Sequence, residues 1–460
     1  MKFLSFLLLW LAGGAVAASS QSEYQKAQGL VDGRALRSLS RVELARVEKM
    51  QEQTVAGDPQ LHEAAFALAE VYIARGAYEQ ATERYRALVE ARPDDGHAYA
   101  GLGFSLAAQG RYSGAMRAYQ DALRRGEKTA LVYARLGHVY QALGHLPENL
   151  NSAGAAYRAS LQIDREQPEI LYQLGRVEAR GGRIEAAGKL MEQALQAAPD
   201  DSGIRVELAA MYRAEGQLQL ARGVIAQGLE LNGDEPVLLQ ELGRFLWEDG
   251  DGVRALSQFE RALAIDPELP LAYRYMGLIH SAAGRLQEAL AAFAELATRQ
   301  PADATTRVNI GIVHSRMGDL AAAEKAFKTA VELGGAGGDA ALKLGGLYVH
   351  QRRLRPAVKL MREATLRHPQ NAELFASLGD IYRQLGLLSA AQETGTVAVR
   401  LDPGRALWRF HLASTYERLD PDRARTEWQQ YLELALDDEQ EASRLDYARE
   451  RLRQLKEKEQ

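Results

Sequence analysis

Apolar residues recur along this chain at the spacing of α-helices, and glycine and proline divide the helical stretches into pairs. The segment 270–303 shows the pattern. Its apolar positions are Leu271, Tyr273, Met276 and Ile279 before Gly284, and Leu286, Ala289, Leu290, Phe293, Leu296 and Ala297 after it. Gly284 permits a left-handed turn after a first helix, and Pro301 ends a second helix because proline has no amide hydrogen. The segment therefore predicts a hairpin of two α-helices.

The hairpin pattern repeats over most of the chain. A column of alanines in the second helix recurs mostly at intervals of 34 residues, at Ala81, Ala115, Ala153, Ala187, Ala221, Ala255, Ala289, Ala323, Ala357, Ala391 and Ala424. Columns of small residues in the first helix, of turn glycines and of prolines keep the same period. Such a hairpin cannot bury its apolar faces alone, so successive hairpins must stack and share a core. We predict an all-α solenoid.

This repeat resembles the tetratricopeptide repeat (TPR) family in its unit length and in its small, aromatic, glycine and proline columns. The resemblance implies a right-handed superhelix of about eleven helical hairpins, with the first helix of each hairpin lining the concave side. It also implies a function in binding other proteins. We predict a signal peptide at 1–18, an N-terminal helical cap at 19–61, the TPR superhelix at 62–434 and a C-terminal capping helix at 435–460.

The first eighteen residues have the pattern of an export signal. Lys2 precedes an apolar run from Phe3 to Leu11, and Ala15-Val16-Ala17 forms a cleavage site of small residues. The alternative is an uncleaved membrane anchor, but a spanning helix needs about 20 apolar residues, more than this stretch offers. No later segment is long and apolar enough to span a membrane. We therefore expect a periplasmic protein, soluble or peripherally associated with the envelope, with no integral membrane insertion after cleavage.

Both ends of the repeat array carry helical signals. Ser40 and Glu43 form a capping box at the start of a helix with Val47 and Met50 on one face. The last residues carry an apolar stripe of Leu445, Ala448, Leu452 and Leu455. A polar-backed terminal helix is what a solenoid needs for solubility, so we interpret both segments as caps. The alternative for the C-terminal helix is docking to a partner.

Three of the departures from the repeat predict a local difference in structure. Extra residues around 145–149 include Pro147, which predicts a bulged loop, either a tolerated insertion or a partner contact. Glu178 stands where other repeats carry tyrosine, which predicts looser packing of that hairpin. The glycine-rich junction 334–338 could act as a hinge between two hairpins, or serve only as a connection.

Composition and motifs exclude most chemistry. With no cysteine, the protein has no disulfide, thiolate metal site or cysteine nucleophile. A formal net charge of −5 and 7% aromatic residues give no reason to expect nucleic acid as a partner. His280 and His314 lie one repeat apart in a column otherwise held by tyrosine, so packing explains them better than metal binding. No metalloprotease, phosphate-loop or serine-hydrolase motif occurs. We predict no cofactor, no metal and no catalytic residue.

The concave face supplies two candidate binding surfaces. The first, which we call the arginine stripe, comprises Tyr172, Arg176, Arg180, Arg213, Gln240, Arg244, Trp247 and Arg274. Arginine pairs with carboxylates and aromatic residues add stacking, so this stripe suits an acidic peptide, the C-terminus of a partner protein or an anionic polysaccharide; the alternative is an ordinary solvated face. The second, which we call the apolar groove, comprises Phe66, Ile73, Phe104 and Leu131. It suits the hydrophobic side chains of a peptide, unless some of these residues belong to the core.

These observations favour a non-catalytic scaffold or adaptor in the envelope of a Gram-negative bacterium. Arginine is far more common than lysine, as in GC-rich bacterial genomes, and the short leader agrees with export. The predicted partners are proteins or peptides of the periplasm and envelope, in polysaccharide export, pilus or outer-membrane assembly. One alternative is a binding module that holds an anionic polysaccharide through the arginine stripe, and another is an enzyme without a known motif.

Overall fold

The computed structural model describes residues 40–57, 62–144, 146–334, 338–436 and 441–457. These residues form α-helices joined by short turns and contain no β-strand. The helices group into two compact units, Met1–Gly233 and Asp234–Gln460, each of which is described by itself. The predicted leader, 1–18, lies outside the described residues, as does much of 19–61.

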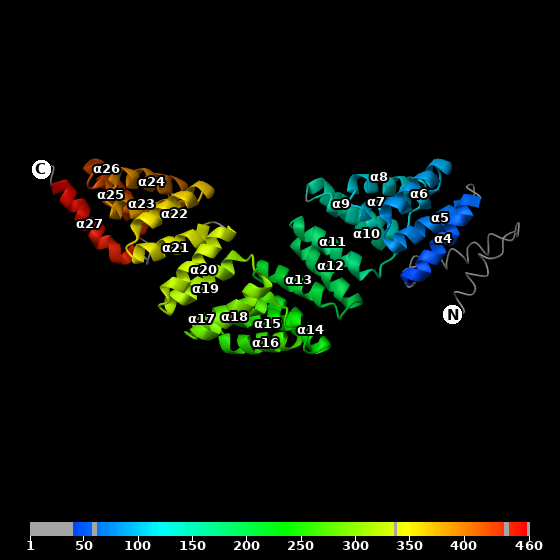
Figure 1. The fold of residues 1–460 in the computed structure, drawn as a ribbon, viewed down its shortest axis with the longest axis horizontal. Helices are drawn as coiled ribbons and strands as arrows, with labels where there is room; N and C mark the ends of the chain where they lie inside the picture. The colour runs from blue at the N-terminus through cyan, green and yellow to red at the C-terminus, as the bar shows by residue number, and fades with distance from the viewer. Residues whose placement is uncertain (1–39, 58–61, 145, 335–337, 437–440, 458–460) are drawn as a thin grey trace. The chain divides into compact units, whose positions relative to one another are not determined.

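The described helices of the first unit are an initial helix and five hairpins (Figure 1). The initial helix is α4 (Arg41–Gly57) and the hairpins are α5 (His62–Arg75) with α6 (Tyr78–Ala91), α7 (Gly96–Ala108) with α8 (Tyr112–Arg124), α9 (Ala130–Ala142) with α10 (Pro147–Ile163), α11 (Pro168–Arg180) with α12 (Ile184–Ala197), and α13 (Ser202–Ala214) with α14 (Leu218–Asn232). Helix α4 packs on α5, and the Tyr72 hydroxyl donates to Glu52 Oε1 at 2.9 Å.

The described helices of the second unit are six hairpins and a terminal helix. The hairpins are α15 (Pro236–Glu248) with α16 (Gly252–Ile265), α17 (Pro270–Ala282) with α18 (Leu286–Arg299), α19 (Ala304–Arg316) with α20 (Leu320–Leu333), α21 (Asp339–His350) with α22 (Leu354–Arg367), α23 (Ala372–Gln384) with α24 (Leu388–Leu401), and α25 (Ala406–Tyr416) with α26 (Pro421–Ala435); the terminal helix is α27 (Ala442–Glu457). Helix α27 packs on α26, and Arg451 pairs with Glu417, which directly follows α25.

An aromatic ring seated on a glycine joins the two helices of many hairpins. At α17–α18, a Cβ added to Gly277 would lie 2.5 Å from Cε1 of Phe293, whose side chain is 1% exposed. The same contact joins Gly103 to Tyr119, Gly137 to Tyr157, Gly243 to Phe259 and Gly311 to Phe327. The predicted small and aromatic columns therefore meet, and the absent glycine side chain sets how closely the helices approach.

First helices lie on the inner side of each unit. Each hairpin packs on the next mainly through its second helix, as α6 does on α7 and α20 on α21. First helices of neighbouring hairpins also contact one another, α7 with α9 in the first unit and α19 with α21 or α23 with α25 in the second. Second helices make no comparable contact with one another among the described residues. Each unit therefore presents its first helices on one face. The predicted all-α solenoid of helical hairpins is confirmed.

The structure differs from the sequence prediction at two of the three departures from the repeat, the extra residues near Pro147 and Glu178. The extra residues near 147 lengthen α10 to 17 residues instead of forming a bulged loop, because Pro147 begins the helix as a proline at its first position can. Glu178 does not loosen its hairpin: its carboxylate is buried between Arg158 and Arg183 and pairs with both. In the glycine junction 334–338, residues 335–337 lie outside the described part, so the hinge stays a prediction.

Substituting two glycines should separate the effect of a contact from that of backbone entropy. We expect Gly277→Ala to lower the free energy of unfolding by about 1–3 kcal/mol, because the added methyl group meets the Phe293 ring. Gly346→Ala is the matched control, since no atom lies within 4 Å of its Cβ position, and it should raise stability by about 0.4–1 kcal/mol. Hydrogen exchange should show lost protection first in α17 and α18. Equal effects of the two substitutions would contradict the ring-on-glycine contact.

Candidate functional site

The arginine stripe is divided between the two units. Tyr172, Arg176 and Arg180 lie on α11 and Arg213 lies on α13, all in the first unit. Gln240, Arg244 and Trp247 lie on α15 and Arg274 lies on α17, in the second unit. The two halves are therefore described separately.

In the first unit, Glu207 of α13 binds two residues of the stripe. The Tyr172 hydroxyl donates to Glu207 Oε2, and Arg176 Nε lies 3.0 Å from Glu207 Oε1. The Arg176 guanidinium carbon lies 5.6 Å from the centre of the Tyr172 ring. Burial, followed by the hydrogen bond to Glu207, raises the pKa of Tyr172 to about 12. Glu207 thus already neutralises the charge of Arg176.

In the second unit, carboxylates pair with both arginines of the stripe. Arg244 pairs with Glu241 one helical turn earlier, and these side chains are only 12% and 5% exposed. Arg274 Nη2 lies 3.2 Å from Asp303 Oδ2 in the next hairpin. Gln240 is buried and Trp247 is half-buried. Arg176, Arg244 and Arg274 of the predicted stripe therefore each pair with a carboxylate of the same protein.

The apolar groove lies on α5, α7 and α9 of the first unit. Phe66 stacks on His97 with ring centres 4.8 Å apart, and Phe104 lies under Arg135, whose guanidinium carbon is 4.3 Å from the ring centre. Leu131 is 56% exposed. Phe66, Ile73 and Phe104 are half-buried and pack against the core behind them. The set thus combines core contacts with an exposed edge.

Sequence reasoning missed the tyrosines behind this groove. Tyr85, Tyr119 and Tyr157 belong to second helices, and their side chains are fully buried. The Tyr85 hydroxyl donates to Glu70, and the Tyr157 hydroxyl lies 3.0 Å from Gln141 Oε1. These partners are on first helices, so each phenol tip reaches the neighbouring first-helix surface. The sequence does carry a sign of these tyrosine contacts. Glu70, Phe104 and His138 occupy the same position in successive 34-residue repeats, and the middle one is apolar where its neighbours are polar.

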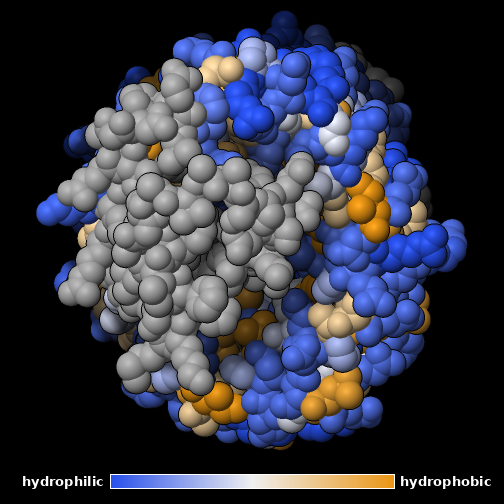
Figure 2. Space-filling view, turned by 90° about the vertical axis from the view of Figure 1, so that its right-hand side faces the viewer, coloured by the Kyte–Doolittle hydropathy of each residue, from blue (hydrophilic) through white to orange (hydrophobic). Residues whose placement is uncertain are grey.

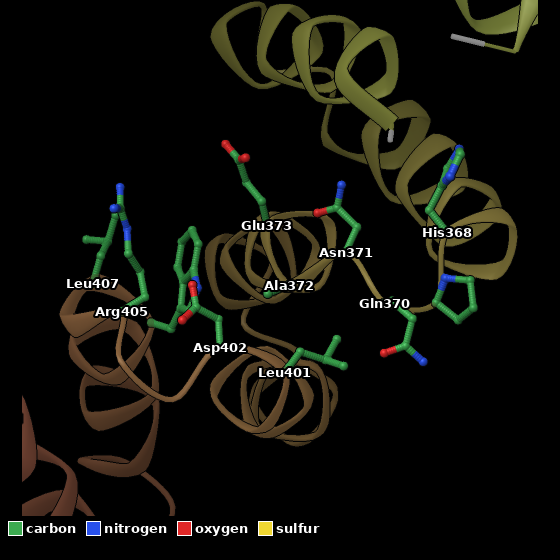
Figure 3. A pocket seen from close by; sticks show the side chains of 11 residues that line it. His368, Gln370, Asn371, Ala372, Glu373, Leu401, Asp402, Arg405 and Leu407 are labelled. Carbon is green, nitrogen blue, oxygen red and sulfur yellow. The ribbon is translucent and has the colours of Figure 1, made fainter. Parts of the chain in front are cut away.

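The second unit contains an open depression of about 850 Å³ between the α22–α23 and α24–α25 connections. Figure 3 shows the side chains of His368, Asn371, Glu373 and Arg405 extending toward the same side. Asp402 adds a second carboxylate to the lining. Acidic and basic groups are mixed, so the depression has no clear charge preference.

Figure 2 shows a mainly hydrophilic face with small, separate hydrophobic patches. Within the described ranges, no three histidine or acidic side chains gather as metal ligands would. None of the helices placed in the structure has the length and hydrophobicity to cross a bilayer.

Comparison with known families shows tetratricopeptide repeat models along most of the sequence. One model matches 135–202, 241–304, 308–355 and 351–406, a second matches 44–103 and 180–242, and a third matches 96–130. No curated protein matches the sequence.

Similar solved structures include yeast Tom70, with 14% identity and a TM-score of 0.43, covering 88% of this chain and 99% of that one. The Cut9-Hcn1 hetero-tetramer of APC/C has 15% identity and a TM-score of 0.40, covering 92% of this chain and 98% of that one. The C-terminal part of a TPR repeat-containing protein from Cytophaga hutchinsonii has 15% identity and a TM-score of 0.42, and the match covers 53% of this chain and 98% of that one.

Removing single hydroxyl groups should distinguish paired from unpaired phenols. Tyr157→Phe removes the bonds to Gln141 and His138 and should lower the free energy of unfolding by about 1 kcal/mol. Tyr119→Phe should be neutral or stabilising, because the Tyr119 hydroxyl is buried without a hydrogen-bond partner. Urea unfolding followed by circular dichroism measures both. A larger loss for Tyr119→Phe than for Tyr157→Phe would contradict this assignment.

Alkaline pH should weaken the Tyr172–Glu207 interaction. The pKa of Tyr172 is about 12 in the folded protein and 10.0 ordinarily, so above pH 10 the unfolded phenol loses its proton first. The stabilisation is complete below pH 10 and is lost as the pH rises through 12. Tyr172→Phe should therefore be less stable than the unmodified protein below pH 10, and the difference should shrink as the pH approaches 12. Thermal unfolding of both proteins between pH 8 and 12 tests this prediction. A stability difference between Tyr172→Phe and the unmodified protein that does not change with pH would contradict it.

Proposed function

Because the chain belongs to the tetratricopeptide repeat family of protein–protein interaction scaffolds, we propose that it is a non-catalytic adaptor of the bacterial envelope. It binds a protein or peptide partner along the face that its first helices present. The machinery it serves is polysaccharide export, pilus assembly or outer-membrane assembly.

The observation that carries this proposal is the apolar groove of the first unit. Phe66 and Phe104 pack against the core on one side and contact His97 and Arg135 on the other, while Leu131 extends into solvent. Half-buried aromatic rings with a cation beside them provide rigid contact area at low entropic cost. Such a surface suits an extended peptide or an amphipathic helix with apolar side chains.

The envelope location rests on the leader sequence at 1–18. Its lysine, apolar run and Ala15-Val16-Ala17 cleavage site support export to the periplasm. After cleavage, the protein would be soluble or peripherally associated with the envelope. Its partners would then be periplasmic or envelope proteins, not cytoplasmic ones.

The alternative partner, an anionic polysaccharide bound by the arginine stripe, has less support. Arg176, Arg244 and Arg274 each pair with a carboxylate of the same protein, so a polyanion would have to displace those partners. Each displacement would leave a partly buried carboxylate unpaired, which is costly. The groove of the first unit requires no such exchange.

Site-specific photocrosslinking in living Gram-negative cells tests the proposal. A photoreactive residue at Leu131, 56% exposed in the groove, should yield adducts with envelope proteins, identified by mass spectrometry. The matched control is the same residue at Leu366 of the second helix α22, which is 82% exposed and should yield few adducts. The adducts should be recovered from the periplasmic fraction.

Two outcomes would contradict the proposal. Equal adducts from Leu131 and Leu366 would exclude the groove as the binding face, and cytoplasmic adducts would exclude the envelope role. If the purified protein retains only acidic polysaccharide, and Arg176→Glu with Arg244→Glu abolishes that retention, the polysaccharide alternative replaces the peptide partner.

A further inference from the structure

Trp408 of α25 departs from the repeat in a way that packing does not require. Counting back from it in steps of 34 residues, the same position of the first helix holds Leu374, Ala340, Thr306, Ala272 and Leu238. All five of those side chains are buried, whereas Trp408 is only half-buried. An indole is much larger than a leucine side chain, so a position that hides small and aliphatic residues leaves part of the ring outside the core.

Trp408 lines the open depression of about 850 Å³ beside the α22–α23 and α24–α25 connections. Its Nε1 atom is buried and has no hydrogen-bond partner among the described residues. Because that polar atom is out of reach, the indole presents carbon surface to the depression. Leu401 and Leu407 add apolar contact area to the same lining.

Unpaired polar side chains surround this apolar surface. His368, Glu373, Asp402 and Arg405 line the depression, and in the ranges that the structure describes none of these side chains forms a hydrogen bond or an ion pair. In Figure 3, Arg405 lies on one side of the depression and His368 on the other, with Glu373 between them. These groups are therefore free to bond a ligand, unlike the paired arginines of the arginine stripe.

The mixture of charges in the lining disfavours an ionic ligand. An anion drawn to Arg405 would also meet the carboxylates of Glu373 and Asp402, and a cation drawn to those carboxylates would meet Arg405. A hydroxyl group avoids this conflict, because it can donate to a carboxylate and accept from a guanidinium group. The lining thus favours an uncharged ligand that carries several hydroxyl groups.

We propose that this depression binds a neutral saccharide, with one sugar ring against the carbon surface of Trp408 and its hydroxyl groups bonded to Glu373, Asp402 and Arg405. The face of a sugar ring presents C–H groups, which the negative face of an aromatic ring attracts, and its rim presents hydroxyl groups. Ligand pockets have volumes of about 300–1,000 Å³, so the depression has room for a short oligosaccharide.

This inference goes beyond the proposed function. The depression lies in the second unit, and the apolar groove that the proposed function depends on lies in the first. It also differs from the polysaccharide alternative, because the ligand is uncharged and none of the arginine stripe lines the depression.

Binding of uncharged oligosaccharides to the full-length protein tests the proposal. The purified protein is applied to an array of α- and β-linked oligomers of glucose, galactose, mannose and N-acetylglucosamine, with an oligomer of galacturonic acid as the acidic comparison. Isothermal titration calorimetry then gives the dissociation constant of each oligosaccharide that the array retains. We expect a neutral oligosaccharide to bind more tightly than the acidic one.

We expect Trp408→Leu to weaken binding of the neutral oligosaccharide by about tenfold or more. This variant should fold, because leucine stands at the same repeat position in Leu238 and Leu374. Glu373→Gln should weaken binding by a smaller factor, since an amide is a weaker acceptor than a carboxylate. Glu363→Gln is the matched control, because Glu363 is an exposed carboxylate of α22 outside the lining and should leave the dissociation constant unchanged.

Three results would overturn this proposal. If no neutral oligosaccharide binds the unmodified protein, the depression is not a saccharide site. If one binds, and folded Trp408→Leu and Glu373→Gln variants keep the same dissociation constant, the saccharide lies elsewhere on the protein. If only the acidic oligomer binds, and Arg176→Glu with Arg244→Glu abolishes that binding, the arginine stripe is the saccharide site instead. Photocrosslinking at Leu131 reports separately on the proposed function, so the two can fail independently.

Discussion

An aromatic ring seated on a glycine is the contact on which the rest of this structure depends. The ring comes from a second helix and the glycine from the first helix of the same hairpin, as with Phe293 on Gly277. The missing side chain lets the helices approach, and the ring fills the remaining space, so neither residue packs well without the other. Because each hairpin leaves apolar faces that it cannot bury alone, the contact recurs in successive hairpins and stability accumulates along the array.

The same contact connects the core to the binding face. Where the ring is a phenylalanine, as in Phe259 and Phe293, its tip ends in the core. Where it is a tyrosine, its hydroxyl reaches the neighbouring first-helix surface and requires a partner there. Tyr85 and Tyr157 have such partners and Tyr119 does not. The same ring position can therefore end in the core or join a polar contact with a first helix, without any change in the backbone that holds it.

Charge on the inner faces depends on pairing more than on composition. Arg176 and Arg274 are bound by carboxylates of the following hairpin, and Glu178 is buried because Arg158 and Arg183 enclose it. Arginines with carboxylate partners link neighbouring helices and attract external anions only weakly.

Sequence alone determined the helical hairpins, their period, the turns and the all-α solenoid, because these follow from apolar spacing and from glycine and proline, which act locally. It also assigned Phe66, Phe104 and Leu131 to first helices of successive hairpins. Only the tertiary structure decided that Pro147 lengthens α10, that Glu178 is paired, and that Glu207 of the next hairpin binds Arg176. Those outcomes depend on side chains of adjacent hairpins meeting in space, and the repeat period does not encode which rotamers and partners they find.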